Sequence, residues 1–202
     1  NYQITQARNA SSGTTQNTVS LSAAPLTVTG TTAPSKTYDG TNTATVTGGS
    51  LSGTKGSDSI TLTQAGTYSS VDAGSNISIT MNDSVSGTGV STNYSLTQPT
   101  VTGTINKAPL GITVSGIYSG STTLSPSSFT TTGLVNSETI STLTSATLNS
   151  KNVADNTTNY VSAIAINSGT ANASNYQITQ ARNASSGTTQ NTATITAKAL
   201  TA

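Results

Sequence analysis

The chain lacks the residue types on which most catalytic and metal sites depend. It contains no cysteine, histidine or tryptophan, and only 6% of its 202 residues are charged. General acid–base catalysis usually needs histidine or paired carboxylates, nucleophilic catalysis needs a base beside serine or cysteine, and transition-metal sites need histidine or cysteine. We therefore expect no enzymatic activity, no catalytic residues and no bound cofactor.

Charge of either sign is also scarce. Seven basic and six acidic residues leave a net charge of +1, too little to attract nucleic-acid phosphates or anionic lipids. No run approaches the roughly twenty apolar residues that cross a bilayer. We expect neither nucleic-acid binding nor membrane insertion. The absence of cysteine fits either a reducing cytosol or a long exported chain. The composition favours the exported chain, whose export signal we expect outside this sequence.

What the chain does contain is a repeat. The eighteen residues Asn1–Thr18 (NYQITQARNASSGTTQNT) return without change at Asn175–Thr192, 174 positions later. Such identity indicates recent duplication, so the sequence is typical of one period of an array plus an overlap. Arrays of this kind build length and multivalent surface.

Apolar residues alternate with hydroxyl residues throughout the chain, as half-buried strands require. Only 32% of residues are hydrophobic, so we expect thin cores and almost no helix. We predict an all-β fold of tandem antiparallel, sandwich-like (immunoglobulin-like) modules in an elongated rod, with β-grasp-like modules or a β-solenoid as alternatives. The alternating segments are Leu26–Val28, Ala44–Val46, Ile60–Leu62, Ile77–Met81, Val101–Ile105, Ile112–Val114, Val161–Ile166 and Ala193–Ile195.

A weaker repeat lies inside the 174-residue period and divides the chain. We predict closing strands of a preceding repeat at residues 1–24, a first module at 25–108 and a second, divergent module at 109–202. The closing strands are expected to pair with the first module or with another copy, since unpaired strand edges are costly. The corresponding segments are Asn93–Gln98 with Asn175–Gln180, Gly56–Ile60 with Asn136–Ile140, Tyr38–Gly40 with Tyr118–Gly120, and Val71–Asp72 with Val153–Asp155.

The first module resembles a known family. Lys36–Val46 (KTYDGTNTATV), Val71–Gly74 (VDAG) and Asn93–Pro99 (NYSLTQP) are similar to the YDG domain, a repeat of very large bacterial filamentous-haemagglutinin-like surface adhesins. The resemblance implies export by two-partner or type I secretion and a place in a stalk, and it supplies neither an activity nor a ligand. The second module carries Tyr118-Ser-Gly120 where the first has Tyr38-Asp-Gly40.

Tyr38, Asp39 and Gly40 predict a structural turn at the end of a strand. The ring of Tyr38 would be buried, Asp39 would accept backbone hydrogen bonds, and Gly40 would take a conformation closed to other residues. Tyr118 and Gly120 are expected to form the equivalent turn. A binding role for either turn would instead require an exposed ring beside convergent polar groups.

Two further sites are weighed and not favoured. Asp39, Asp72 and Asp83 are candidate Ca²⁺ ligands because they fall near turns, but their spacing matches no known calcium loop, and isolated turn caps are the preferred interpretation. A Lys–Asn isopeptide bond would need Lys36, Asn93 and a carboxylate from Asp58 or Asp83 to meet. Most lone lysines are simply solvated.

We therefore predict a structural stalk of a secreted or cell-surface bacterial adhesin or fibre that is able to self-associate. Its expected partners are neighbouring repeats of the same chain or other copies. The alternative is a module that binds a glycan or a host surface, which would show a concave patch of tyrosine with asparagine, aspartate or glutamine.

Overall fold

The computed structural model describes residues 20–87, 90–182 and 190–201 and shows an all-β chain. Within these ranges the helices are one four-residue turn, α1 (Val90–Asn93), and the 3-10 helices η1 (Val153–Asp155) and η2 (Ala173–Asn175). No helix of the described part is long and apolar enough to cross a membrane. The predictions of an all-β fold and of almost no helix are confirmed.

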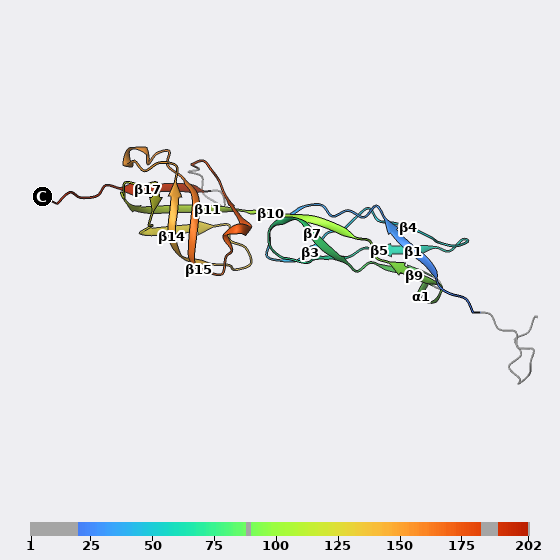
Figure 1. The fold of residues 1–202 in the computed structure, drawn as a ribbon. Coiled ribbons are helices and arrows are strands. Elements are labelled where there is room, and N and C mark those ends of the chain that lie inside the picture. The colour runs from blue at the N-terminus through green and yellow to red at the C-terminus, as the bar shows by residue number, and fades with distance from the viewer. Residues whose placement is uncertain (1–19, 88–89, 183–189, 202) are drawn as a thin grey trace, which may run out of the picture.

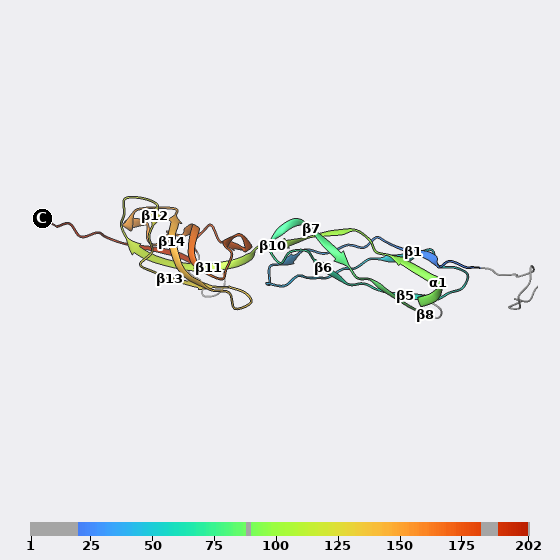
Figure 2. The same cartoon turned by 60° about the horizontal axis from the view of Figure 1, so that its bottom comes forward.

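The described strands form two groups, which lie one beyond the other along the long axis of Figures 1 and 2. The strands of the first group are β1 (Ala24–Thr29), β2 (Lys36–Thr37), β3 (Thr43–Ala44), β4 (Ser50–Ser52), β5 (Ile60–Thr63), β6 (Gly66–Tyr68), β7 (Gly74–Met81), β8 (Ser84–Gly87), β9 (Tyr94–Thr97) and β10 (Val101–Asn106). Those of the second group are β11 (Ala108–Ile117), β12 (Thr123–Leu124), β13 (Ser128–Thr132), β14 (Ile140–Leu148), β15 (Val161–Gly169), β16 (Tyr176–Ile178) and β17 (Asn191–Thr196).

Each described strand pairs only with strands of its own group. The first group contains sheets in the orders β4-β1-β9, β2-β10-β7-β6-β3 and β5-β8. The second contains β13-β11-β16, with β17 also on β11, and β12-β14-β15. These pairings do not stack one coil on the next, so they give no support to a solenoid. Only Lys107 separates β10 from β11.

The prediction of antiparallel modules is wrong in one respect, because both groups contain parallel pairs. β1 runs parallel to β9, β2 to β10, and β11 to both β16 and β17. Alternation of apolar and polar residues fixes the face on which a side chain lies and carries no information about the direction of the neighbouring strand. The sheets are therefore mixed.

The same pairing register occurs once in each group. In the first group Ala24 pairs with Tyr94 and Leu26 with Leu96. In the second group Ala108 pairs with Tyr176 and Leu110 with Ile178. Each Ala-Pro-Leu segment thus lies beside an Asn-Tyr segment from the far end of its own group.

Nearly all the alternating segments form strands, and the exception is instructive. The segment predicted at residues 44–46 is a strand only at Ala44. The chain then leaves the sheet and makes a single bridge between Thr47 and Thr32. Glycines at positions 48 and 49 follow directly, and glycine weakens strand structure.

The core extends from one group into the other. Within the described residues, one buried cluster combines Tyr38, Tyr68 and Ile105 of the first group with Leu110 and Tyr176 of the second. A second cluster lies inside the second group, around Val114 and Val161. The two groups are therefore packed against each other through buried apolar side chains.

The closing strands predicted for residues 1–24 lie largely outside the described residues. Residues 20–23 have no strand structure, and β1 begins at Ala24.

Candidate functional site

The signature turn Tyr38–Gly40 follows directly after β2 and is fixed by its own hydrogen bonds. The Tyr38 amide donates to the Asn106 carbonyl at 2.7 Å, which continues the β2–β10 pairing. Asp39 accepts from the Thr41 amide at 2.9 Å and its hydroxyl at 2.8 Å, and it contacts Lys36 Nζ at 2.8 Å. Partial burial opposes ionisation of Asp39, but the bonds from Lys36 and Thr41 outweigh it and lower its pKa.

The Tyr38 side chain points out of its own group and into the second. Only 5% of it is exposed, and its ring meets the ring of Tyr176 edge to face, with centroids 5.6 Å apart and an interplanar angle of 80°. This is a favourable aromatic arrangement. The Tyr38 hydroxyl donates to Glu138 Oε1. The sequence predicted burial of this ring, and the structure buries it between groups.

Glu138 accepts hydrogen bonds from two tyrosines of different groups. Tyr176 donates to its Oε2 at 2.7 Å, while Tyr38 occupies Oε1. The Tyr176 hydroxyl in turn accepts from the Val135 amide at 3.1 Å. Val135 and Glu138 belong to one turn, closed by a 2.9 Å bond from the Glu138 amide to the Val135 carbonyl.

Burial and Glu138 together keep both tyrosines protonated. Burial, followed by the hydrogen bond to Glu138, raises the pKa of Tyr176 to about 12. The same two causes, in the same order, raise the pKa of Tyr38. Both hydroxyls therefore remain donors across the ordinary pH range.

Asn175 makes the second polar contact between the groups. The 3-10 helix η2 ends at Asn175, whose side chain is only 1% exposed. Its Oδ1 accepts from the Ala73 amide at 2.9 Å, and its Nδ2 donates to Asp72 Oδ1 at 2.8 Å. A buried amide whose donor and acceptor are both used adds specificity as well as stability.

Gly40 allows the two groups to approach closely at this point. Its φ is 73°, in the left-handed region that glycine tolerates. A Cβ atom at position 40 would lie 2.8 Å from the Cβ of Asn136, too close for any other residue without movement. We call the whole contact the joint. It consists of Tyr38, Gly40, Asp72 and Ala73 of the first group with Asn136, Glu138, Asn175 and Tyr176 of the second.

The structure also places the turn predicted at Tyr118–Gly120. The Tyr118 amide donates to the Thr196 carbonyl at 2.8 Å, and Gly120 has a φ of 79°. Ser119 replaces the aspartate, and its hydroxyl contacts the Ser121 amide at 3.4 Å. The Tyr118 side chain is 37% exposed, in contrast to Tyr38.

The candidate calcium ligands are not brought together. Asp39 lies against Lys36, Asp72 against Asn175, and Asp83 accepts from the Ala65 amide at 3.1 Å. No group of three or more acidic side chains able to hold a metal ion occurs in the described part of the chain.

The residues considered for an isopeptide bond also have separate partners. Lys36 Nζ bonds to the Thr41 carbonyl at 2.8 Å and contacts Asp39. Asp58 accepts from the Tyr94 hydroxyl at 2.6 Å. The structure therefore gives no reason to expect this cross-link.

A hollow of about 410 Å³ lies beside the joint on the second group. Lys107, Ser162, Gln177 and Gln180 are among its lining residues. Gln180 already donates to the Ser162 carbonyl at 2.9 Å. Tyr176 also lines the hollow, but its ring is buried and its hydroxyl is used, so the hollow has no exposed aromatic platform of the kind that sugars prefer.

Every motif of the joint is visible in the sequence, but the joint itself is not. Tyr38–Gly40 corresponds to Tyr118–Gly120, and Gly56–Ile60 to Asn136–Ile140, as equivalent segments of the inner repeat. Equivalence between repeats does not reveal which segments of successive repeats touch. One signal was available for Glu138: a carboxylate stands at this position in both copies, in a chain with only six acidic residues.

Comparison with known proteins agrees with the family resemblance over part of the chain. Residues 22–102 match the YDG domain. No curated protein and no solved structure matches the chain. The YDG domain therefore contains both motifs that the first group contributes to the joint, Tyr38–Gly40 and Asp72–Ala73.

Proposed function

We propose, taking the YDG domain at residues 22–102 as the starting point, that the chain is a stalk segment of a bacterial surface adhesin or fibre. In this proposal the YDG domain and residues 109–202 are consecutive sandwich-like modules in an elongated rod. The parent would be a secreted or surface-attached, filamentous-haemagglutinin-like protein. The segment would have no enzymatic activity and no cofactor.

One observation carries the proposal: the signature residues of the YDG domain are used to hold the next module. Tyr38 donates to Glu138, and Asp72 accepts from Asn175. A binding or catalytic motif would instead be expected to converge on an accessible cavity. Residues used to fix one module on the next are what an array needs in order to project a distal region.

The connection between the groups supports stiff coupling. Only Lys107 lies between β10 and β11, so no flexible linker separates the two modules. The buried cluster that includes Ile105 and Leu110 continues across this point. The module boundaries we propose are 24/25 and 108/109; β1 and β11 begin one residue before them, at Ala24 and Ala108.

The surface composition suits an extracellular fibre. With 6% charged residues, solubility depends on hydroxyl and amide groups, which salt does not screen. The partners we propose are neighbouring repeats of the same chain and other copies of it. Residues 1–24 would be the end of the preceding repeat, since residues 1–18 duplicate residues 175–192.

Labelling of cells tests the location. An antibody raised against the chain should bind intact cells of the source bacterium as strongly as permeabilised cells. A cytosolic protein, labelled only after permeabilisation, is the control. Labelling of the chain that requires permeabilisation would contradict the proposed surface location.

Solution scattering tests the architecture. The pair-distance distribution of the 202-residue chain should be that of an elongated particle, as drawn in Figure 1. A compact particle, or a broad ensemble of bent forms, would contradict a stiff stalk.

The alternative, a glycan-binding module, rests on the hollow beside Tyr176, which is lined by the amides of Gln177 and Gln180. A glycan array decides between the two functions. Binding abolished by Gln177→Ala would favour recognition, whereas absence of binding leaves the stalk.

A further inference from the structure

In the joint, the residues around Tyr176 receive the Tyr38 side chain. The first group carries a similar arrangement around Tyr94. In the joint, Tyr176 bonds to the carboxylate of Glu138 and the amide of Val135. In the first group, Tyr94 donates to Asp58 Oδ2 at 2.6 Å and accepts from the Lys55 amide at 2.9 Å.

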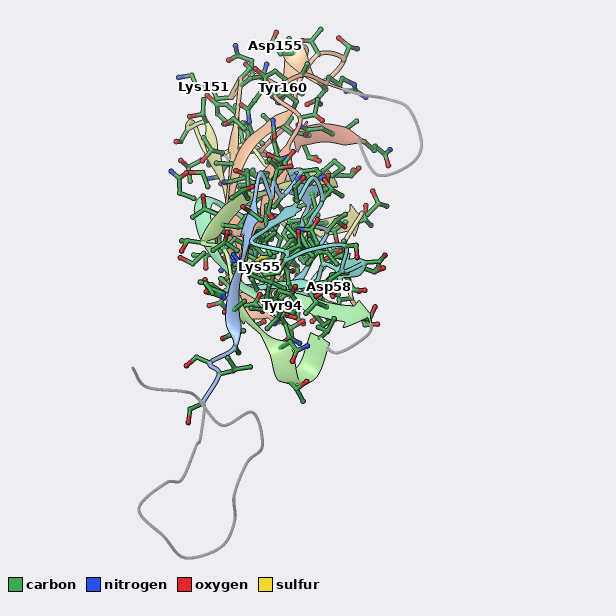
Figure 3. The ribbon with its side chains drawn as sticks, turned by 90° about the vertical axis from the view of Figure 1, so that its right-hand side faces the viewer. Lys55, Asp58, Tyr94, Lys151, Asp155 and Tyr160 are labelled. Atoms are coloured by element: carbon green, nitrogen blue, oxygen red, sulfur yellow. The ribbon has the colours of Figure 1, made fainter. Side chains whose placement is uncertain are left out.

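The supporting turns correspond as well. The Asp58 amide donates to the Lys55 carbonyl at 3.2 Å, as the Glu138 amide does to the Val135 carbonyl. Gly56 has a φ of 57°, and Asn136, its counterpart, has a φ of 51°. We call Lys55, Gly56, Asp58, Asn93 and Tyr94 the Tyr94 socket. Figure 3 looks onto this end of the molecule and shows Lys55, Asp58 and Tyr94 close together.

The Tyr94 socket is built but uncovered. Asp58 and Asn93 are exposed, whereas Asn175, the counterpart of Asn93, is 1% exposed in the joint. Among the described residues, no atom beyond its two chain neighbours lies within 4 Å of a Cβ built at Gly56. The carboxylate of Asp58 thus has one tyrosine donor where Glu138 has two.

The opposite end of the molecule carries Tyr118, the counterpart of the Tyr38 that inserts into the joint, and this tyrosine is partly exposed. Tyr118 follows the pairing of Ile117 with Thr196, just as Tyr38 follows the pairing of Thr37 with Asn106. Tyr118 is 37% exposed and Ile117 is 59% exposed.

The neighbouring positions match the joint in the same way. A Cβ at Gly120 would have no neighbour within 4 Å, whereas one at Gly40 would meet Asn136. Val153, in the segment that corresponds to Val71–Asp72, is also exposed. Asn156 bonds to both backbone groups of Ile195, which holds that segment beside β17. We call Ile117–Gly120 with Val153–Asp155 the Tyr118 end.

We propose that the Tyr118 end of one copy of the chain docks on the Tyr94 socket of another. The Tyr118 hydroxyl donates to Asp58, and its ring packs edge to face on Tyr94, as Tyr38 packs on Tyr176. Asn93 takes the place of Asn175 against Val153–Asp155. This inference rests on the proposed stalk function, and it assigns the second kind of contact that an array needs.

The order of the repeat explains why these two surfaces meet. Residues 1–18 have the sequence of residues 175–192, so in the array a module of the second type stands before the YDG domain. Its free end is a Tyr118 end, and the surface that it meets is the Tyr94 socket. Two contacts, the joint and this one, then alternate along the array.

Disulfide trapping between two single variants tests the contact, because the natural chain has no cysteine. Gly56→Cys and Gly120→Cys occupy the positions equivalent to Asn136 and Gly40. The two proteins are mixed and oxidised at roughly millimolar concentration, the effective concentration that a short linker provides inside an array. Heterodimer is expected to exceed either homodimer several-fold.

Three comparisons make the trapping decisive. A chain carrying both Gly40→Cys and Asn136→Cys reports the joint itself. The two Cβ atoms would start 2.8 Å apart, closer than the roughly 3.5–4.5 Å of a disulfide, so the bond should close within one molecule after a small local shift. Gly120→Cys mixed with Thr61→Cys, an exposed position on β5, gives the level of random collision. Adding Tyr118→Ala to the Gly120→Cys chain should reduce heterodimer to that level.

Heterodimer no more abundant than the collision control would overturn the inference, as would a yield unaffected by Tyr118→Ala. Thermal melts of the variants confirm that each is folded. If no specific heterodimer forms but scattering still shows an elongated particle, the proposed contact is wrong and the stalk function is unaffected. A compact or bent particle would instead remove the stalk function.

Discussion

The carboxylate of Glu138 is one of the polar contacts between the two groups. It accepts from Tyr38 and from Tyr176, both of which are largely buried. Hydrogen bonds to a charged acceptor are stronger than neutral ones.

Replacing Glu138 with Gln should therefore destabilise the joint. Gln keeps the shape, but it loses the charge and offers one acceptor oxygen to two donors. We expect a loss of about 1–3 kcal/mol in the free energy of unfolding, measured by urea denaturation. Asp58→Asn is the control: Asp58 is exposed and has one tyrosine donor among the described residues, so this variant should lose clearly less stability than Glu138→Gln. Equal losses at the two positions would contradict this account.

Alkaline pH should weaken the joint. Burial and Glu138 raise the pKa of Tyr176 to about 12 in the folded chain, against about 10 when unfolded. Its contribution is therefore fully present below pH 10 and is lost as the pH rises from 10 towards 12. Tyr38, whose pKa is also raised, acts in the same direction.

The measurement is the unfolding free energy between pH 9 and pH 12. A fall on the order of 1–2 kcal/mol is expected for the natural chain. Tyr176→Phe should be less stable at pH 9 but should lose less over the same interval. A natural chain whose stability is constant to pH 12 would be inconsistent with the protonated pair.

At the scale of the elements, β15 and β17 of the second group are joined by a side chain rather than by a ladder. Asn191, at the start of β17, is fully buried. Its Oδ1 accepts from the Val161 amide at 2.9 Å, and its Nδ2 donates to the Val161 carbonyl at 2.8 Å. The Asn191 side chain therefore makes the two hydrogen bonds to Val161 that a neighbouring strand would otherwise make.

Replacing Asn191 with Ala should cost about 2–4 kcal/mol, because both backbone groups of Val161 would be left buried without partners. Asn167→Ala is the matched control. Asn167 lies on β15, and its amide donates to Thr142 at an exposed position. Thermal melts of the two variants check the difference, and similar melting temperatures would show that the bridge contributes little.

The strands were predictable from sequence to different degrees. Alternation located β7 (Gly74–Met81) and β10 (Val101–Asn106) because a thin core leaves each strand one apolar face. The parallel course of β1 beside β9 was not predictable, because it depends on where the chain returns after some seventy residues. The bridge made by Asn191 was missed for a related reason: a buried asparagine has no periodic signature.

At the scale of the whole molecule, the joint should make the two groups unfold together. The cluster that includes Ile105, Leu110 and Tyr176 belongs to both groups. If one group unfolds, the apolar side chains of the other group that pack against it become exposed to water, which is unfavourable. Independent domains would be expected only for a small or polar contact.

Tyr38→Ala should separate the two groups thermodynamically. We expect one calorimetric transition for the natural chain and two for this variant, since the ring and its bond to Glu138 are lost together. Tyr118→Ala removes the equivalent but exposed tyrosine and should leave a single transition. Two transitions in the natural chain would contradict coupling through the joint.

The candidate site was predictable in its parts and not in its assembly. Tyr38, Asp72 and the Asn175-Tyr176 pair stood out because they recur between repeats. Their meeting depends on the angle at which β10 passes into β11, which no local pattern specifies. The repeat therefore predicts the residues, and the three-dimensional packing decides their partners.

The parallel pairing of β11 with β17 has a mechanical consequence. The six residues Ile112–Ile117 run beside Asn191–Thr196 in the same direction. The chain enters the second group through β11, at the end that faces the first group, and leaves it after β17 at the other end (Figure 1). Tension applied to the chain ends thus loads this ladder in shear, so that its bonds must rupture together instead of unzipping in turn. Extension under load is governed by that barrier, so in the proposed stalk the second group would resist lengthening.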